Sequence, residues 1–276
     1  MGKTYFDIMK DLDYELGGVK VGYADLSSHS AVLYDSARTE LNADHFDGGR
    51  IYIVASSATT NPVGEIREIK TSGNSKGIYI PTSPFSQDIS LGDTYWIVPS
   101  YYTLDELKLA VNRVIAGLTV PEEDTSLDYD QDVMVYTLPS SIPDPDDLLQ
   151  VHLQVSTSPV DWVEHTDWKV RENGTVFIEG IRNPSWYDDA SILLVYASTP
   201  NTLDAYTDTL HKKIHEDIVI YGAAKKVMFT NLRRSGNDPT TDDRYIHFAT
   251  DEAKALKDHK IAMPQKPLKP SGFGQF

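Results

Sequence analysis

The sequence lacks cysteine altogether: none of its 276 residues is a Cys. Disulfide bonds, a thiol nucleophile and thiolate metal ligands are therefore excluded. Long apolar runs are also missing, since no stretch approaches the roughly 18 residues that a membrane span needs. The first residues, MGKTYFDIMKDLDYEL, contain acidic side chains where a signal peptide would be apolar. We therefore expect a soluble protein that is made in the cytosol, does not contact a membrane and is stabilised by packing or assembly.

Motifs for nucleotide binding are absent as well, and nucleophilic catalysis has little support. The sequence contains no GxxxxGK[ST] or GxGxxG loop, and the glycines of DGGR and TSGNSKG follow neither pattern. The stretch GNSKG at residues 73–77 fits the GxSxG nucleophile pattern, but it lies in a turn-like cluster, as most of the serines do. We therefore expect neither an enzyme nor a cofactor.

Basic residues are scarce. Lys and Arg number 25 against 41 Asp and Glu, which gives a formal net charge of −16. Residues 211–276 differ, with 12 basic and 8 acidic residues, whereas residues 1–210 hold 13 and 33. A chain this acidic does not coat nucleic acid through counterion release. We interpret the basic end as solvated helix surface, with a docking face for an acidic partner as the alternative.

Two kinds of periodicity alternate along the chain. Apolar residues at helical spacing after Thr4 predict a helix that ends at residues 17–18, a Gly-Gly pair. Alternating strand patterns separated by turn residues then predict an antiparallel β unit from about residue 30 to 100. A capping box formed by Thr103 and Glu106 precedes an apolar stripe, which predicts a second helix.

The second half of the chain repeats this alternation. PEEDTSLDYDQD is interpreted as an acidic connector. Strand patterns over residues 133–197 predict a second β unit with Asn173-Gly174 in a hairpin turn. Apolar residues every three or four positions over 203–232 predict a long helix, and a further helix is expected over about 242–260. The end of the chain, with three prolines and two glycines, is expected to be an extended arm.

The predicted fold is therefore α+β, a helical frame with two inserted antiparallel β units. The frame comprises an N-terminal helix, a middle helix and a pair of C-terminal helices, and an extended C-terminal arm follows it. Separate α and β domains would give the same pattern. The expected segments are residues 1–29 (N-terminal helix and the stretch after it), 30–100 (first β unit), 101–127 (helix and acidic connector), 128–200 (second, sandwich-like β unit), 201–260 (C-terminal helices) and 261–276 (arm).

The stretch HKKIHE is the clearest candidate for chemistry. On a helix, His211 and His215 would lie one turn apart and could hold a divalent metal, with Glu216 adjacent. A zincin requires HExxH, however, and a lysine stands here where the catalytic glutamate would be. We interpret the pair as part of a helix–helix or subunit contact beside Leu210 and Ile214, and predict no metal site.

Acidic clusters and aromatic side chains are the remaining candidates. Paired carboxylates can hydrolyse glycosides or bind calcium, but DYDQD lacks the glycine and terminal glutamate of an EF-hand, so solvated loops are preferred. Aromatic residues could stack on sugars, although they commonly anchor β cores and interfaces. The acidic residues are Glu122, Glu123, Asp124, Asp128, Asp130, Asp132, Asp144, Asp146 and Asp147, and the aromatic ones are Trp96, Tyr101, Tyr102, Trp162, Trp168, Trp186 and Tyr187.

The order of helices and β units, rather than any one motif, points to a protein family. The runs that carry the pattern are GGRIYIV, GEIREI, PFSQDISLGDTYWI, LDELKLAVNRVI, VYTLPSSI, LLQVHLQV and LHKKIHEDIVIYGAAKKVMF. Together they cover most of the chain and resemble the head-to-tail connector, or adaptor, proteins of the tailed-bacteriophage neck. The simplest members of that family are small helical proteins. The two β units depart from them and leave contacts with fibres, whiskers or neighbouring tail proteins open.

This resemblance implies a virion structural protein without enzymatic activity. It would form a homo-oligomeric ring, usually a dodecamer in that family, beneath the portal protein, and downstream neck or tail proteins would dock on it. Double-stranded DNA would pass through its channel without sequence-specific contact. The acidic body suits this role, because a weakly repulsive channel lets DNA slide. The basic arm would become ordered on binding an acidic neighbouring ring.

Assembly residues are predicted in two places, a stripe on the long C-terminal helix and the arm. The alternatives that remain open are a carbohydrate-binding module, a structural protein associated with tail fibres or the baseplate, and an acidic-pocket hydrolase. The sequence identifies no specific pair of carboxylates that could act as the catalytic residues of a hydrolase. The predicted assembly interface comprises Leu210, Ile214, Ile218, Tyr221 and Met228, and the predicted portal-docking arm comprises Lys266, Leu268, Lys269 and Phe273.

Overall fold

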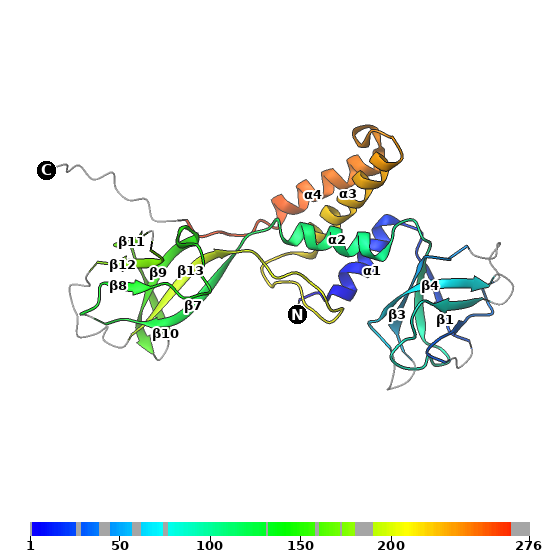
Figure 1. Cartoon of the computed structure of the whole chain (residues 1–276), viewed down its shortest axis with the longest axis horizontal. Coiled ribbons are helices and arrows are strands. Elements are labelled where there is room, and N and C mark those ends of the chain that lie inside the picture. The colour runs from blue at the N-terminus through cyan, green and yellow to red at the C-terminus, as the bar shows by residue number, and fades with distance from the viewer. Residues whose placement is uncertain are drawn as a thin grey trace. The chain divides into compact units, whose positions relative to one another are not determined.

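The chain divides into two compact units, which are described separately (Figure 1). The first unit combines Met1–Gly117 with Asn201–Lys260, and the second combines Leu118–Pro200 with Ile261–Phe276. The computed structural model describes residues 2–25, 29–38, 45–56, 62–73, 77–130, 132–157, 160–171, 173–179 and 190–265.

A curled six-stranded antiparallel sheet, a half-barrel, forms the β part of the first unit. Its strand order is β1-β6-β3-β4-β5-β2. The strands are β1 (Lys20–Tyr23), β2 (Leu33–Tyr34), β3 (Arg50–Ala55), β4 (Ile66–Gly73), β5 (Ile78–Pro81) and β6 (Thr94–Val98).

Strand β3 lies in the middle of this sheet and is buried on both faces. Ile51 and Ile53 belong to the apolar core of the half-barrel. Arg50 and Tyr52 alternate with them and therefore point to the opposite face, where they contact the first helix. The GRIYIV run thus joins the sheet core to the helical part of the unit.

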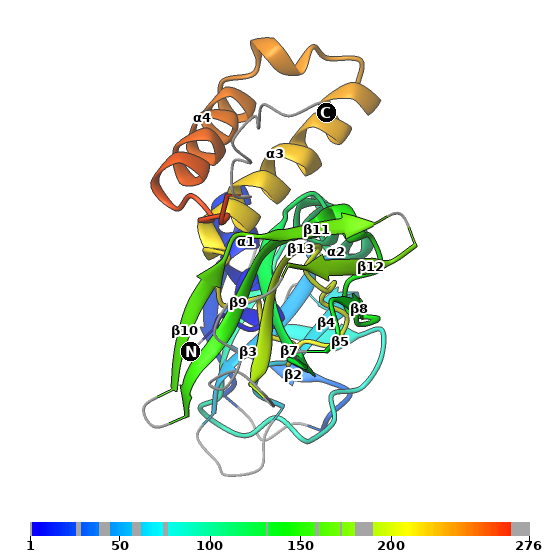
Figure 2. The same ribbon diagram turned by 90° about the vertical axis from the view of Figure 1, so that its left-hand side faces the viewer.

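Four helices complete the first unit, and the third contacts each of the other three. Helices α3 and α4 lie side by side as a hairpin (Figure 2). The predicted capping box of Thr103 with Glu106 is present, and the predicted N-cap Thr4 forms a second box with Asp7. The helices are α1 (Tyr5–Leu16), α2 (Leu104–Ile115), α3 (Glu216–Arg234) and α4 (Asp243–Asp258), with a short 3-10 turn, η3 (Pro239–Thr241), between the last two.

A buried polar cluster fixes α1 on the sheet. The guanidinium of Arg50 donates two hydrogen bonds to the carboxylate of Asp13, at 2.9 and 2.7 Å. The Tyr52 hydroxyl donates to the same carboxylate, and Arg50 also donates to the Tyr102 carbonyl. Burial raises the pKa of Tyr52 well above its usual value, and the Asp13 anion adds to that shift. Tyr52 therefore remains a hydrogen-bond donor.

The second unit is a β-sandwich of two antiparallel sheets. One sheet has the order β10-β9-β13-β7 and the other β11-β12-β8. Buried apolar residues of both sheets share a single core, so the sheets pack face to face. The strands are β7 (Val120–Asp128), β8 (Val135–Thr137), β9 (Leu148–Thr157), β10 (Val160–His165), β11 (Trp168–Arg171), β12 (Thr175–Ile178) and β13 (Ser191–Ser198), with a 3-10 turn, η1 (Pro145–Asp147), before β9.

The predicted helical frame with two inserted β units is wrong. The chain is rich in β structure, with thirteen strands in three antiparallel sheets and four helices among the described residues. Two strands were missed. Strand β1 lies inside the predicted N-terminal helical segment, and the supposed acidic connector is strand β7, which pairs with the buried strand β13.

The long helix predicted from residue 203 begins only at Glu216. Residues 201–215 instead run beside the start of α1, where Tyr5 and Phe6 donate backbone hydrogen bonds to the carbonyls of Asp208 and Tyr206 at 2.7 and 3.1 Å. The first N–H groups of a helix have no hydrogen-bond acceptor within the helix. Carbonyls of residues 201–215 accept from two of these groups in α1. Leu203, Leu210 and Ile214 are buried there without helical geometry, which is why their spacing misled the prediction.

None of the helices among the described residues is both long enough and apolar enough to cross a membrane.

Candidate functional site

Most residues of the predicted assembly stripe are buried by contacts within the first unit. Only Ile218, Tyr221 and Met228 lie on α3, because Leu210 and Ile214 precede it. All of these side chains except the half-buried Tyr221 are buried. The stripe thus packs α3 against its own chain. The predicted arm residues Lys266, Leu268, Lys269 and Phe273 lie outside the described residues.

Two of the predicted acidic residues, Asp124 and Asp144, accept hydrogen bonds from nearby backbone and hydroxyl groups. Although partial burial disfavours the Asp124 anion, hydrogen bonds from Ser126 and Ser141 lower its pKa. Asp144 accepts from the Asp146 N–H at 2.9 Å and so caps the turn η1. These carboxylates are held by hydroxyl and backbone donors, which is the chemistry of turns.

The predicted aromatic residues occupy several different environments. Trp168 is buried in the core of the sandwich. Trp96 lies near the Tyr14 ring and under the Lys10 ammonium, which is 5.3 Å from the centre of its indole. Tyr101 is exposed beside the start of α2. Trp162 lies half-buried on the sheet-edge strand β10, and Trp186 and Tyr187 lie outside the described residues.

A groove between α2 and α3 combines exposed apolar groups with positive charge. Its volume is about 280 Å³, and Tyr101 and Leu109 on its rim are 61% and 51% exposed. The basic side chains that line it are Arg113, Lys226 and Arg234, of which Arg234 forms an ion pair with Glu106. Apolar rim residues next to cations suit a partner that is acidic and carries an apolar anchor.

The two helices that line this groove pack closely against each other. Gly222 of α3 packs against α2, and a Cβ at that position would lie 3.1 Å from both methyl groups of Val114. The small residue therefore allows the two helices to approach each other closely. Glu106, on the first turn of α2, accepts from the backbone N–H of Thr103, and this bond together with Arg234 lowers its pKa despite partial burial. The capping box thus also orients a side chain of the groove.

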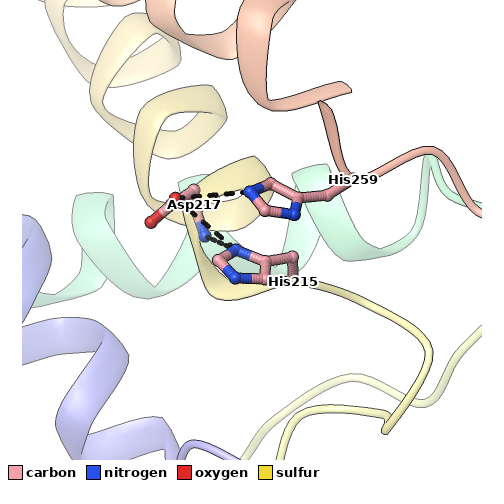
Figure 3. Close-up of side chains that lie close together, drawn as sticks. All are labelled: His215, Asp217 and His259. Carbon is pink, nitrogen blue, oxygen red and sulfur yellow. Dashed lines mark hydrogen bonds and ion pairs between the residues drawn. The ribbon is translucent and has the colours of Figure 1, made fainter. Parts of the chain in front are cut away.

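The histidines of HKKIHE do not form the helical pair that the sequence suggested. His215 is the N-cap of α3, where its Nδ1 accepts from the Asp217 N–H at 3.3 Å. His211 lies in the preceding turn, and its Nδ1 accepts from the Lys213 N–H. The neighbour of His215 is instead His259, the C-cap of α4, whose ring stacks on it with centroids 3.5 Å apart (Figure 3).

Asp217 completes a cluster with these two stacked imidazoles (Figure 3). One of its carboxylate oxygens lies 3.5 Å from His215 Nδ1 and 3.8 Å from His259 Nε2. All three side chains are half-buried. Among the described residues, this is the one group of three or more His, Asp and Glu side chains close enough together to share a metal ion.

The groove and the His-Asp-His cluster were both missed from the sequence. Leu109 gave a signal for the groove, because it is an apolar residue outside the stripe that α2 buries. His259 gave no local signal, since it meets His215 only through the α3–α4 hairpin. A scan against protein-family models and a search of curated proteins found no match. The functional argument therefore rests on the residues and the fold.

Proposed function

We propose that this chain is a non-enzymatic structural protein of a tailed-phage virion, a head-to-tail adaptor that assembles as a ring beneath the portal. In this proposal the ring extends the DNA channel and docks neck or tail components. The resemblance of the sequence runs named above suggests that family, and the exposed apolar and basic groove between α2 and α3 is the observation that carries the assembly argument.

Charge is the reason to assign the groove to a contact between copies. The groove is basic, whereas residues 118–200 hold 16 Asp and Glu against 3 Lys and Arg, a net charge of −13. In a closed ring each subunit contacts one neighbour through one surface and the other neighbour through a different surface. The groove of one copy would therefore receive an acidic surface of the adjacent copy.

A charge reversal in the groove tests this contact. Arg113→Glu should prevent or strongly weaken ring formation on the purified portal, because it places a carboxylate against an acidic neighbour. Lys254→Glu, which changes an exposed lysine on α4 by the same amount, is the matched control and should assemble normally. Equal assembly of both variants would remove the groove from the interface.

The portal contact is assigned to the basic C-terminal arm. Truncation after Met263 should abolish retention by the immobilised portal protein while leaving the circular dichroism spectrum of the chain unchanged. Retention equal to that of the full chain would show that the arm is not the portal contact. Quenching of tryptophan fluorescence by sugars, without portal binding, would instead favour a carbohydrate-binding module.

A further inference from the structure

The ends of two helices bring three potential metal ligands together. His215 caps the start of α3, Asp217 lies in its first turn, and His259 caps the end of α4. Imidazole nitrogens and a carboxylate oxygen form a donor set that suits zinc and similar divalent metals. The three residues belong to the first unit, so the cluster does not depend on the placement of the second.

The distances in the cluster are close to those of a coordinated ion. Zinc bonds of 2.0–2.1 Å in a tetrahedral site place neighbouring ligand atoms about 3.3 Å apart. The Asp217 oxygen lies 3.5 and 3.8 Å from the two histidine nitrogens, and all ligand atoms lie within 4.8 Å of one another. We propose that His215, Asp217 and His259 bind a divalent metal ion of the zinc type, with hydroxide or another small anion at the fourth position.

The stacked rings define what must change when the ion binds. The two imidazole planes are 3° from parallel and 3.5 Å apart at their centres, so their lone pairs do not meet at one point. One ring must turn about its Cβ–Cγ bond, a torsion with broad preferences. Both side chains are about one-third exposed, which leaves them room to turn. Metal binding therefore breaks the stack, and coordination through His215 Nδ1 would also replace the cap hydrogen bond that this nitrogen accepts from the Asp217 N–H.

The charges around the cluster favour some ligands over others. Lys3, Lys212 and Lys260 line the hollow next to His215 and His259 and oppose a dication. The carboxylates of Asp217 and Glu216 lie on the same first turn of α3 and offset part of that repulsion. The neighbouring lysines would accordingly favour an anion or hydroxide over neutral water as the fourth ligand.

An ion at this position would join the start of α3 to the end of α4. His259 is the last residue before Lys260, after which the chain leaves the first unit. The ion would therefore fix the point from which the C-terminal segment departs. This inference does not depend on the proposed adaptor function.

Metal titration of the full chain tests the site. Zn²⁺ followed by calorimetry should bind with a stoichiometry of one, and Co²⁺ should give the visible absorption of a tetrahedral complex. His259→Ala, His215→Ala and Asp217→Asn should each weaken binding by at least about tenfold. His247→Ala is the matched control, because His247 lies on α4 and pairs with Asp251 at 3.2 Å, and no described residue completes a group of three metal ligands there.

Several results would overturn the proposal. They are absence of zinc binding by the wild-type chain, equal binding by the wild-type and His259→Ala chains, or loss of binding in His247→Ala alone. Imidazole NMR signals of the wild-type chain provide a check that requires no variant. Zinc should shift the signals of two histidine rings, assigned to His215 and His259, and shifts confined to other histidines would contradict the site.

Discussion

Arg50 shows at the scale of single residues how the first unit is held together. Its side chain and that of Asp13 are almost completely buried, at 0% and 1% exposure. A buried ion pair contributes little net stability, because desolvation offsets its attraction. Loss of one partner is costly, however, because it leaves the other charge buried and unpaired. The pair therefore specifies where α1 lies on the sheet more than it adds stability.

Removal of the Arg50 charge should strongly destabilise the protein. Arg50→Met leaves the Asp13 carboxylate buried without its cation, and we expect a loss of about 3–5 kcal/mol in the free energy of unfolding. Urea unfolding followed by near-ultraviolet circular dichroism measures it. Lys3→Met, which breaks the partly exposed Lys3–Asp11 pair, is the control and should cost less than about 1 kcal/mol. Similar losses in the two variants would contradict this role of Arg50.

Glu106 should make stability depend on pH in the acidic range. The Thr103 N–H and the Arg234 cation lower its pKa below the usual 4.5 despite partial burial. The stabilisation is therefore present above about pH 4.5 and is lost as the pH falls through the lower folded-state value. Glu106→Gln should be less stable at pH 7, and its unfolding free energy should fall less between about pH 5 and 3 than that of the wild type. Parallel curves for the two proteins would refute this.

At the scale of elements, the sequence correctly predicted helix starts and turns, which residues close together in the chain determine. The starts of α1 and α2 were correct because Thr4 and Thr103 form capping boxes with residues only three positions away. The hairpin at Asn173-Gly174 was also correct, with Gly174 at a φ of 73°. Caps and turns depend on neighbours in the chain, so the sequence alone reveals them.

The errors arose where distant segments decide the structure. Residues 201–215 have helical spacing, yet their carbonyls pair with the first N–H groups of α1. Residues 120–128 carry four acidic side chains, yet they pair with the buried strand β13. For the candidate sites, the apolar Leu109 lies outside the buried stripe of α2 and could have pointed to the groove, whereas no residue near His215 in the sequence pointed to His259.

The capping box of α2 should contribute measurably to stability. Thr103→Ala removes the hydroxyl that accepts from the Glu106 N–H, and we expect a loss of about 0.5–2 kcal/mol. Thr250→Ala, an exposed threonine in the middle of α4, should be neutral or slightly stabilising, because alanine favours the helix. Thermal unfolding of both variants measures the difference, and an unchanged Thr103→Ala protein would show that the cap contributes nothing.

At the scale of the whole molecule, charge is divided unequally along the chain. Residues 118–200 hold a net charge of −13 out of a total of −16, and residues 211–276 hold a net +4. A contact between an acidic and a basic surface weakens with salt, because the screening length falls from about 10 Å at 0.1 M to about 3 Å at 1 M. Assembly of this chain should therefore depend on ionic strength.

Salt should dissociate the proposed ring without unfolding its subunits. We expect the assembled fraction, measured by analytical ultracentrifugation, to fall between about 0.1 and 1 M sodium chloride while the circular dichroism spectrum stays constant. Because the rim of the groove is apolar, some contact between subunits should survive at high salt. Assembly that strengthens steadily with salt would mean that apolar burial, and not charge, controls it.

The mass of the purified chain in solution, alone and mixed with its candidate portal ring, tests the central claim most directly. Light scattering should give a monomer alone and a complex containing a defined number of copies, about a dodecamer in the family that the chain resembles, when the portal is present. A chain that stays monomeric and unbound with the portal would contradict the adaptor function. Binding to glycans under the same conditions would then favour the carbohydrate-binding alternative.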